Sequence, residues 1–365
     1  MKKIIAATVL TVAAAQVPVY AGSLDAVIGG VDFNVSGFGT YGVVGTNTNS
    51  AQFVRDGQPS GADESFSDKV DSNLAIQITA RVNSWLSATV QVLDEQRQYS
   101  KYLTADVSWA YLKIDPITDL SFKVGRVEMP LFAISDSRDV NYVNTWVRPP
   151  NEVYSLADIE ELNGAEASYN LPLGSTHLTL TGFAGNSTVT ESSGATYNSW
   201  DVHGGEARWE TEWLTVRAGI ATCEPELSPG VHDTYTFSGI GFIVDHDNIV
   251  AQSEFVRRKS AGYPQYVNSS GWYVLGGYRL GQVLPYVTYA STTKATPYAA
   301  VGALSYDQSS EALGVRWDAF KSADLKFQLE RVDPRGTSGI SFTRTAPDFG
   351  DKTVTVMSLA LDFVF

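Results

Sequence analysis

The sequence predicts an antiparallel transmembrane β-barrel of about sixteen strands, and three observations lead to this fold class. Segments of alternating apolar and polar residues recur along the whole chain. The links between these segments alternate between short turns and long loops. After residue 21, no uninterrupted apolar run reaches the roughly 20 residues that a membrane-spanning helix needs. A chain that crosses a bilayer without such helices must satisfy its backbone in a closed barrel.

The first 21 residues have the features of an export signal. Lys2 and Lys3 form a short basic region, residues 4–15 form an apolar stretch, and Val19-Tyr20-Ala21 provides a cleavage site. An apolar stretch of this length is too short to cross a bilayer as a helix. We therefore expect a signal peptide over residues 1–21 and one barrel domain over residues 22–365.

Period-2 segments bounded by turn-prone residues define sixteen predicted strands in chain order. Tight links such as Asn83-Ser84 and Gly281-Gln282 join them on one side, and long links join them on the other. The predicted strands are 31–46, 69–82, 85–94, 103–114, 120–126, 163–171, 176–184, 200–210, 213–222, 235–246, 248–258, 269–280, 283–291, 308–318, 324–332 and 353–365. The predicted long links are 47–68, 127–162, 185–199, 223–234, 292–307 and 333–352.

Each predicted strand carries its apolar residues on one face and its polar residues on the other. In the strand 69–82, Leu74 and Ile76 lie opposite Gln77, and in the strand 324–332, Phe327 lies opposite Glu330. Aromatic residues near both strand ends indicate that the apolar face meets lipid, because such girdles mark the two membrane interfaces. The predicted girdles comprise Trp85, Phe122, Tyr169, Trp213, Trp317, Phe363 and Phe365 at the short turns, and Tyr41, Tyr102, Trp200, Tyr235 and Tyr289 at the long loops.

The chain ends on an alternating strand that closes with Phe365, on the same face as Phe363. An aromatic residue in this place resembles the signal by which bacterial outer-membrane barrels are passed to their assembly machinery. The resemblance implies that Phe365 is a C-terminal assembly signal and that the protein is located in the bacterial outer membrane.

The link 127–162 is the longest, and it is unusually rich in apolar and aromatic residues for an exposed loop. Its Pro130-Leu131-Phe132 and Trp146–Pro150 elements resemble a version seen in porin-like proteins of marine gamma-proteobacteria. Over its mature length the chain resembles the sixteen-stranded trimeric porins of Gram-negative bacteria, whose third long loop folds into the lumen and narrows the pore. The Pro-Glu-Phe-Gly-Gly-Asp element of the enterobacterial porins is missing, so their constriction residues are not carried over.

The resemblance implies a homotrimeric channel for passive diffusion of small hydrophilic solutes. The long link contains seven acidic residues (Glu128, Asp136, Asp139, Glu152, Asp158, Glu160 and Glu161) against two basic ones, which predicts a mild cation preference. The candidate constriction residues are Glu128, Asp136, Arg138, Asp139, Arg148 and Glu152, and the candidate basic residues of the pore wall are Arg81, Lys123, Arg208 and Arg217.

The net charge and the histidine positions argue against nucleic-acid binding, enzyme activity and metal binding. Without Lys2 and Lys3, 24 basic residues face 40 acidic ones, a net charge of −16 that repels nucleic acid. The four histidines have neither metal-ligand spacing nor an identifiable serine partner, so we expect no enzyme activity, cofactor or metal. The basic cluster Arg257-Arg258-Lys259 is expected to contact lipopolysaccharide phosphates or to form a solvated rim.

Two alternatives to a general diffusion channel remain. A solute-selective porin, for sugars or for an anion, would show saturable block of its conductance by one solute. A secreted or surface β-rich adhesin would have the same alternating strands, and it would fail to insert into bilayers.

Overall fold

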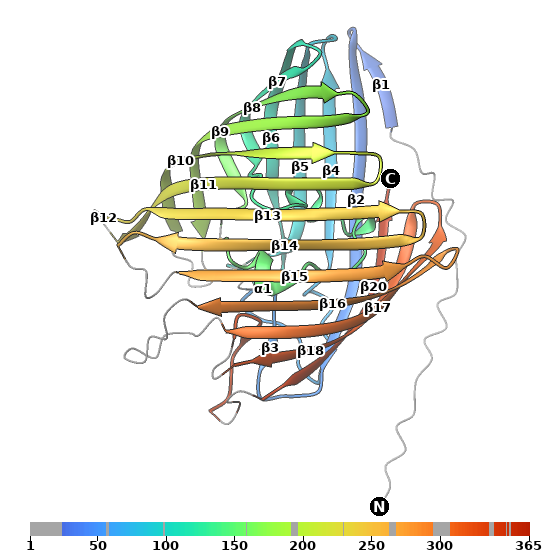
Figure 1. Ribbon diagram of the computed structural model, residues 1–365, viewed down its shortest axis with the longest axis vertical. Coiled ribbons are helices and arrows are strands. Elements are labelled where there is room, and N and C mark those ends of the chain that lie inside the picture. The colour runs from blue at the N-terminus through green and yellow to red at the C-terminus, as the bar shows by residue number, and fades with distance from the viewer. Residues whose placement is uncertain are drawn as a thin grey trace, which may run out of the picture.

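The computed structural model describes residues 24–55, 58–97, 99–157, 159–190, 196–228, 230–262, 268–294, 307–335, 339–347, 349 and 352–365. The predicted signal peptide and Asp158 lie outside the described residues. The structure is nearly all β, and all sixteen predicted strands are present (Figure 1). No helix in the part of the chain that the structure describes is long and apolar enough to cross a membrane.

Each barrel strand pairs antiparallel with the strands before and after it, and the last pairs with the first, so the predicted closed barrel is confirmed. The barrel strands are β2 (Val31–Thr46), β4 (Asn73–Arg81), β5 (Leu86–Gln96), β6 (Leu103–Ile117), β7 (Leu120–Glu128), β8 (Glu161–Leu173), β9 (Thr176–Thr190), β10 (Thr196–Glu210), β11 (Leu214–Ser228), β13 (Tyr235–His246), β14 (Ile249–Ser260), β15 (Ser269–Tyr278), β16 (Val283–Lys294), β17 (Gln308–Phe320), β18 (Ala323–Pro334) and β20 (Val354–Val364).

Several short elements were not predicted. β1 (Leu24–Ile28) pairs with β2, β12 (Val231–His232) pairs with β11, and β3 (Gln52–Phe53) pairs with β19 (Phe342–Thr343) between two long loops. The link between β7 and β8 contains two 3₁₀ turns, η1 (Ser135–Ser137) and η2 (Asn141–Val143), and the short helix α1 (Asn151–Tyr154). Two-residue strands and single turns are too short for a residue period to reveal them.

β1 and β20 share one edge of β2, end to end. β20 pairs with residues 38–46 of β2, and β1 pairs with residues 31–35. Between them, the Phe365 N–H donates to the Gly37 carbonyl at 2.9 Å, and the Gly37 N–H donates to the Phe365 carbonyl at 2.8 Å. The Phe365 and Phe363 rings lie over Gly37 and Gly39, where a Cβ would collide with them. These glycines therefore make room for the chain's own terminal rings at the closure seam.

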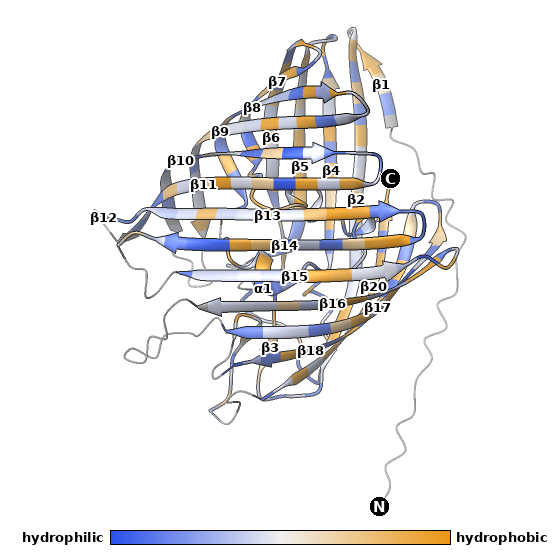
Figure 2. Cartoon of the chain, viewed as in Figure 1, coloured by the Kyte–Doolittle hydropathy of each residue, from blue (hydrophilic) through white to orange (hydrophobic). Residues whose placement is uncertain are grey.

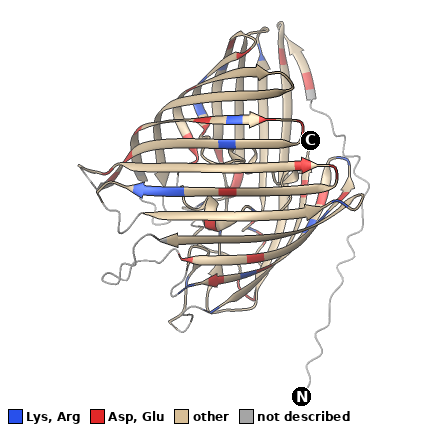
Figure 3. Cartoon of the chain, in the orientation of Figure 1, with Lys and Arg blue, Asp and Glu red and all other residues tan. Residues whose placement is uncertain are grey.

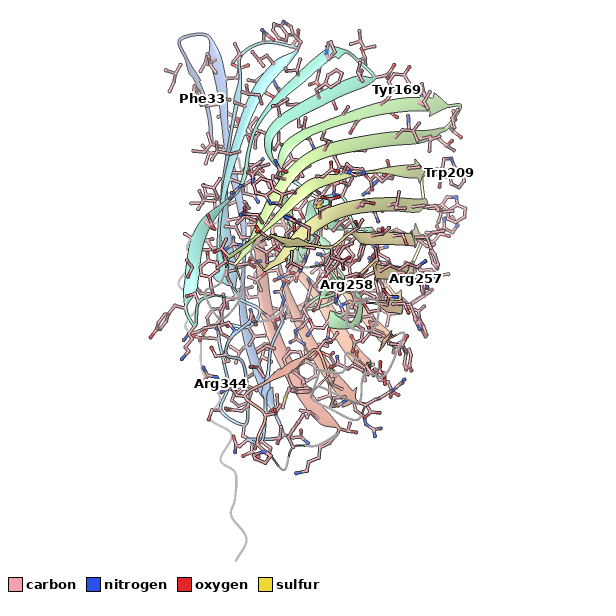
Figure 4. The ribbon with its side chains drawn as sticks, turned by 90° about the vertical axis from the view of Figure 1, so that its left-hand side faces the viewer. Phe33, Tyr169, Trp209, Arg257, Arg258 and Arg344 are labelled. Carbon is pink, nitrogen blue, oxygen red and sulfur yellow. The ribbon has the colours of Figure 1, made fainter. Side chains whose placement is uncertain are left out.

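Hydrophobic and hydrophilic residues follow one another along the strands (Figure 2), and the two faces of the wall differ as this alternation predicts. On β20, Leu359 and Met357 are exposed on the outer face, whereas Ser358 and Asp362 are buried on the inner face. Large apolar side chains stay exposed around the outer surface, and aromatic side chains such as Tyr169 project from the ends of the strands at the short turns (Figure 4). An outer face of this kind is suited to lipid rather than water.

One predicted girdle residue was wrong. Tyr235 is only partly exposed, because it packs against the apolar cluster on the inner face of the barrel. Its strand begins at this residue and pairs it with Cys223, which is also buried in that cluster. Of the other long-loop aromatics, Tyr41, Tyr102 and Trp200 are exposed as expected, and Tyr289 is partly exposed.

Candidate pore and its lining

The link between β7 and β8, described over residues 129–157 and 159–160, lies against the inner face of the wall and is called the lumen segment below. Its Phe132 ring packs on Phe237, with ring centroids 5.3 Å apart, and Trp146 packs on Tyr273 at 5.2 Å. Helix α1 contacts β14 to β17. Burying these aromatic side chains removes apolar surface from water, which is the main reason for the segment to stay on the wall.

Basic residues of the wall bind the backbone of the lumen segment. An irregular segment leaves carbonyl oxygens without ladder partners, and buried carbonyls must find donors. Three inward-facing side chains supply them and so fix the path of the segment. Arg217 donates to the carbonyls of Pro130 and Leu131, Arg316 to those of Tyr142 (2.7 Å) and Asn144 (2.9 Å), and Lys326 to that of Asn141 (2.5 Å).

Arg148 connects the lumen segment to three other parts of the chain. Its guanidinium donates two hydrogen bonds to Asp71, at 2.9 and 2.8 Å, one to Glu330 at 2.8 Å, and one to Ser358. It also lies 4.9 Å from the centroid of the Phe53 ring. Burial opposes its charge, but Asp71 and Glu330 raise the pKa of Arg148 above its usual value. The guanidinium charge of Arg148 is therefore neutralised by partners within the protein.

Two long loops cover the lumen segment near Arg148. Phe53 from the loop before β4 packs on Phe342 from the loop before β20, with centroids 5.9 Å apart. Asn151 donates from Nδ2 to the Val54 carbonyl at 2.9 Å and to the Ser341 hydroxyl at 2.9 Å. We call this part of the interior, between the lumen segment and strands β11 to β20 with β2, the sealed side.

Glu152 is buried on the sealed side. Its Oε1 accepts a hydrogen bond from Gln308 Nε2 at 2.8 Å, while its Oε2 has no partner among the described residues. Burial, and secondarily the charge of Glu330, raises the pKa of Glu152 to about 7. The carboxyl group is therefore held in a place that favours its neutral form.

A cavity of about 240 Å³ remains on the other side of the lumen segment, which we call the open side. Its wall comes from β5 to β9, the lumen segment, the loop between β2 and β4, and the loop between β5 and β6. Five acidic and four basic residues line it, so both signs of charge meet in a small volume. The lining residues are Arg55, Gln58, Glu95, Gln96, Arg97, Tyr99, Asp106, Arg126, Arg138, Asp139, Glu160, Glu161 and residues 187–190.

Only part of this charge is neutralised locally. Arg138 Nη2 lies 2.8 Å from Glu160 Oε1, and Arg97 Nη1 lies 3.5 Å from Glu95 Oε1. Burial, and then the charge of Glu160, raises the pKa of Asp139 above its usual value. Crowded carboxylates of this kind are stabilised by any cation that enters, because each opposes the ionisation of the others.

Further charges lie along the lumen segment and the wall beside it. The Asp136 side chain is 71% exposed and lies 4.0 Å from Arg208. Lys123 forms an ion pair with Glu166 at 2.9 Å. These residues lie on or beside β7 and β8, which also line the cavity, and β10, which pairs with β9.

The candidate site residues are thus distributed over both sides. Arg138 and Asp139 line the cavity, and Glu128 lies beside Trp109, whose Nε1 donates to it at 3.1 Å. Arg148 and Glu152 are on the sealed side, where their buried side chains do not line the cavity. Their polar atoms are directed at wall and loop residues instead.

The predicted basic residues of the pore wall also differ in their exposure. Arg217 is buried and holds the lumen segment, with Glu206 Oε2 only 2.6 Å from its Nε. Arg208 and Lys123 are partly exposed, and Arg81 is exposed at the short-turn end of β4. A strand pattern assigns these side chains to the inner face, but it does not tell which of them a folded-in segment will cover.

Sequence reasoning missed most of the cavity. Four cavity residues lie near strand ends or in the loops after β2 and β5, where charged residues normally face solvent: Arg55, Glu95, Arg97 and Asp106. The one available signal was charge of both signs at neighbouring strand ends. In the described part of the chain, no group of three or more His, Cys, Asp or Glu is placed to hold a metal ion.

No protein-family model and no curated protein matches the sequence. Solved structures match it over nearly the whole chain. OmpF of Salmonella typhi in complex with daunomycin has 12% identity and a TM-score of 0.63, covering 94% of this chain and 100% of that one. The anion-selective porin from Comamonas acidovorans has 11% identity and a TM-score of 0.60, with 92% and 100% covered.

The trimer form of OmpT, an outer membrane protein of Vibrio cholerae, has 12% identity and a TM-score of 0.57, with 91% and 99% covered. At such identities the likeness shows a shared fold. The chain therefore has the fold of the outer-membrane porins, as its strand pattern and loop sequence predicted.

Proposed function

We propose that this protein is a porin of a bacterial outer membrane, which lets small hydrophilic solutes diffuse through a water-filled passage. The observation that carries the proposal is a closed sixteen-stranded barrel with an apolar outer face and a charged cavity inside. A barrel with this many strands is wide enough to enclose an aqueous channel. The lumen segment then narrows that channel to its open side.

The proposed passage is mildly selective for cations. Five acidic and four basic residues line the cavity, and the exposed Asp136 adds a further carboxylate near Arg208. This excess is smaller than the seven acids against two bases of the whole link, because the wall and loops add Arg55, Arg97 and Arg126 to the lining. Charges along a narrow passage act at short range on permeating ions, so a small excess favours one sign by a few-fold.

The same proposal implies how the barrel is oriented in the membrane and what it contacts there. The long-loop end faces outward from the cell, where Arg257 and Lys259 are exposed at the end of β14 (Figures 3 and 4). These side chains are placed to bind lipopolysaccharide phosphates, since guanidinium and ammonium groups pair well with phosphate. Phe365 serves as the assembly signal, and a homotrimer is supported by the solved trimer form with the same fold.

The proposal is tested by reconstituting the purified protein in planar bilayers. We expect stepwise conductance increases and, in a salt gradient at low ionic strength, a reversal potential with the cation-selective sign. An anion-selective reversal potential would overturn the proposed cation preference, but it would not contradict the proposed channel. Failure to insert, with the protein remaining soluble without detergent, would favour a secreted adhesin instead.

A further inference from the structure

Two residues that line the cavity on the open side have buried polar atoms, an acceptor and two donors, without partners among the described residues. Gln96 is 3% exposed and lines the cavity, and its Oε1 accepts no hydrogen bond among the described residues. Its Nε2 is already engaged, because it donates to the Ser60 hydroxyl at 2.9 Å. An acceptor left without a donor at a cavity wall calls for a donor from outside the protein.

Arg97, in contrast, has hydrogen-bond donors that lack acceptors among the described residues. Its side chain is 12% exposed, and its Nε and Nη2 donate to no acceptor in the described part of the chain. The remaining nitrogen, Nη1, has only a long 3.5 Å contact with Glu95. A guanidinium has a planar fork of donors that fits a carboxylate or phosphate, and here most of that fork is unoccupied.

Two acidic residues of the cavity lack a basic partner in the part of the chain that the structure describes. Among the described residues, Asp139 and Glu161 have no ion pair shorter than 4.0 Å with a basic side chain, although both line the cavity. Asn73 fixes the backbone of this region by donating to the Asp139 carbonyl at 2.9 Å. A positively charged donor is therefore favoured within the same cavity that presents an unoccupied guanidinium.

The size of the cavity limits what fills it. Its volume of about 240 Å³ is below the roughly 300–1,000 Å³ of pockets that take drug-sized ligands. A solute that brings one carboxylate and one ammonium group within this volume is a small zwitterion. Sugars have no charge to meet the unoccupied guanidinium, and a simple anion leaves the carboxylates and the Gln96 oxygen unsatisfied.

We propose that this cavity is a binding site for small zwitterionic solutes, of the size of an amino acid or a short peptide. The carboxylate of the solute binds Arg97, and its ammonium group binds Asp139, Glu161 and the Gln96 oxygen. The inference rests on the proposed porin function and names the class of solute that the passage favours. Transport needs a weak site, so that the solute can leave again.

Three probes of similar size test both ends of the site in planar bilayers. They are L-glutamine, its N-acetyl derivative, which lacks the ammonium group, and its α-amide, which lacks the carboxylate. Each is added at increasing concentration while single-channel current and its noise are recorded. We expect L-glutamine to reduce the current most, at concentrations about tenfold lower than either derivative, because each charged hydrogen bond lost costs about a factor of ten.

Simple charge selectivity predicts a different order. A cation-preferring passage without a zwitterion site would respond most to the positively charged α-amide, less to L-glutamine, and least to the N-acetyl derivative. Such a ranking by net charge, or equal responses to all three, would overturn the inference while the channel itself remained. Absence of any conductance would instead count against the proposed porin function.

Two variants test which residues bind the carboxylate and the ammonium group of the solute. In Arg97→Gln the response to L-glutamine should fall about tenfold, to that of the α-amide, while the response to the α-amide stays unchanged. In Asp139→Asn the response should fall to that of the N-acetyl derivative. Lys113→Gln is the matched control, because Lys113 pairs with Asp115 at 3.1 Å and does not line the cavity.

Folding of each variant is checked by its heat-dependent mobility on gels and its open-channel conductance. A folded Arg97→Gln channel that still distinguishes L-glutamine from the α-amide would exclude Arg97 as the carboxylate site. If the Lys113→Gln control lost the discrimination as well, the recognition would lie in the overall charge of the lumen rather than in this cavity.

Discussion

The sealed side and the open side of the lumen both contain charged residues, but they use the charges differently. On the sealed side Arg148 has four side-chain hydrogen bonds to Asp71, Glu330 and Ser358. On the open side, Arg97 has a single ion-pair contact among the described residues, between its Nη1 and Glu95 Oε1 at 3.5 Å. A buried ion network whose members satisfy one another holds a structure in place. A guanidinium whose donors have no partner can still bind a further acceptor.

The largest expected effect comes from breaking the sealed side at Arg148. In Arg148→Met, Asp71 and Glu330 lose their buried partner, so the free energy of unfolding should fall by about 3–5 kcal/mol. Equilibrium unfolding in urea would measure this loss. The detached lumen segment should also increase open-channel current noise in bilayers.

A compensated variant distinguishes lost charge balance from lost packing. Arg148→Met combined with Asp71→Asn and Glu330→Gln removes all three charges together and should recover most of the stability. If the triple variant were as unstable as Arg148→Met alone, the packing of Arg148 on Phe53 would be the main contribution.

The second test uses pH on the sealed side. Because the pKa of Glu152 is raised to about 7 from an ordinary value of 4.5, the folded protein binds a proton more tightly than the unfolded chain. This contribution is fully present below pH 4.5 and is lost as the pH rises through 7, a difference of up to about 3 kcal/mol. Glu152→Gln should therefore match the wild type at pH 4 and exceed its stability at pH 8, in urea unfolding.

The third test concerns the seam that both sides share. Deleting Phe365 removes two backbone hydrogen bonds to Gly37 and the ring above that glycine, which should cost about 2–3 kcal/mol. Export to the periplasm should continue, while the amount of folded protein in the outer membrane falls. Phe320→Ala is a suitable control, since Phe320 is an exposed aromatic residue at a short turn. Undiminished accumulation of the shortened chain would contradict both roles of Phe365.

The smallest effect is expected on the open side. The double variant Asp136→Asn with Asp139→Asn should lower the cation-to-anion permeability ratio by a few-fold. The reversal potential should therefore shift toward zero. In the wild type the cation preference should weaken on acidification earlier than an ordinary aspartate would allow, because the pKa of Asp139 is raised. Glu311→Gln on the outer face should change neither measurement.

The fold could be read from the sequence because each strand carries its own period. β2 and β13 begin and end at the predicted residues, and β7, β9, β10 and β16 differ only where they extend into a predicted long link. β9 and β10, for example, continue into residues 185–199, because a hairpin can rise above the membrane while its ladder stays paired. Local alternation and turn residues determine these elements, so no long-range contact had to be known.

The candidate site depended on contacts that no local pattern contains. Arg148 was predicted to line the constriction, and it is bound to residues about 77 to 210 positions away. Arg217 lies on the inner face as the alternation implies, but the lumen segment covers it. Arg97 and Gln96 follow the predicted end of a strand, and only the folded chain brings them beside Asp139.

The shared edge of β2 also has a consequence for the order of events in folding. Neighbouring barrel strands elsewhere follow one another along the chain, whereas Thr40 and Asp362 join across the seam over 322 residues. Closing a loop of that length costs about 5 kcal/mol of chain entropy, so this pairing should form late. Until β20 arrives, most of the edge of β2 offers unpaired N–H and C=O groups to other chains. β1 covers only its first residues in the meantime, and an unfinished barrel therefore needs a partner that shields the rest.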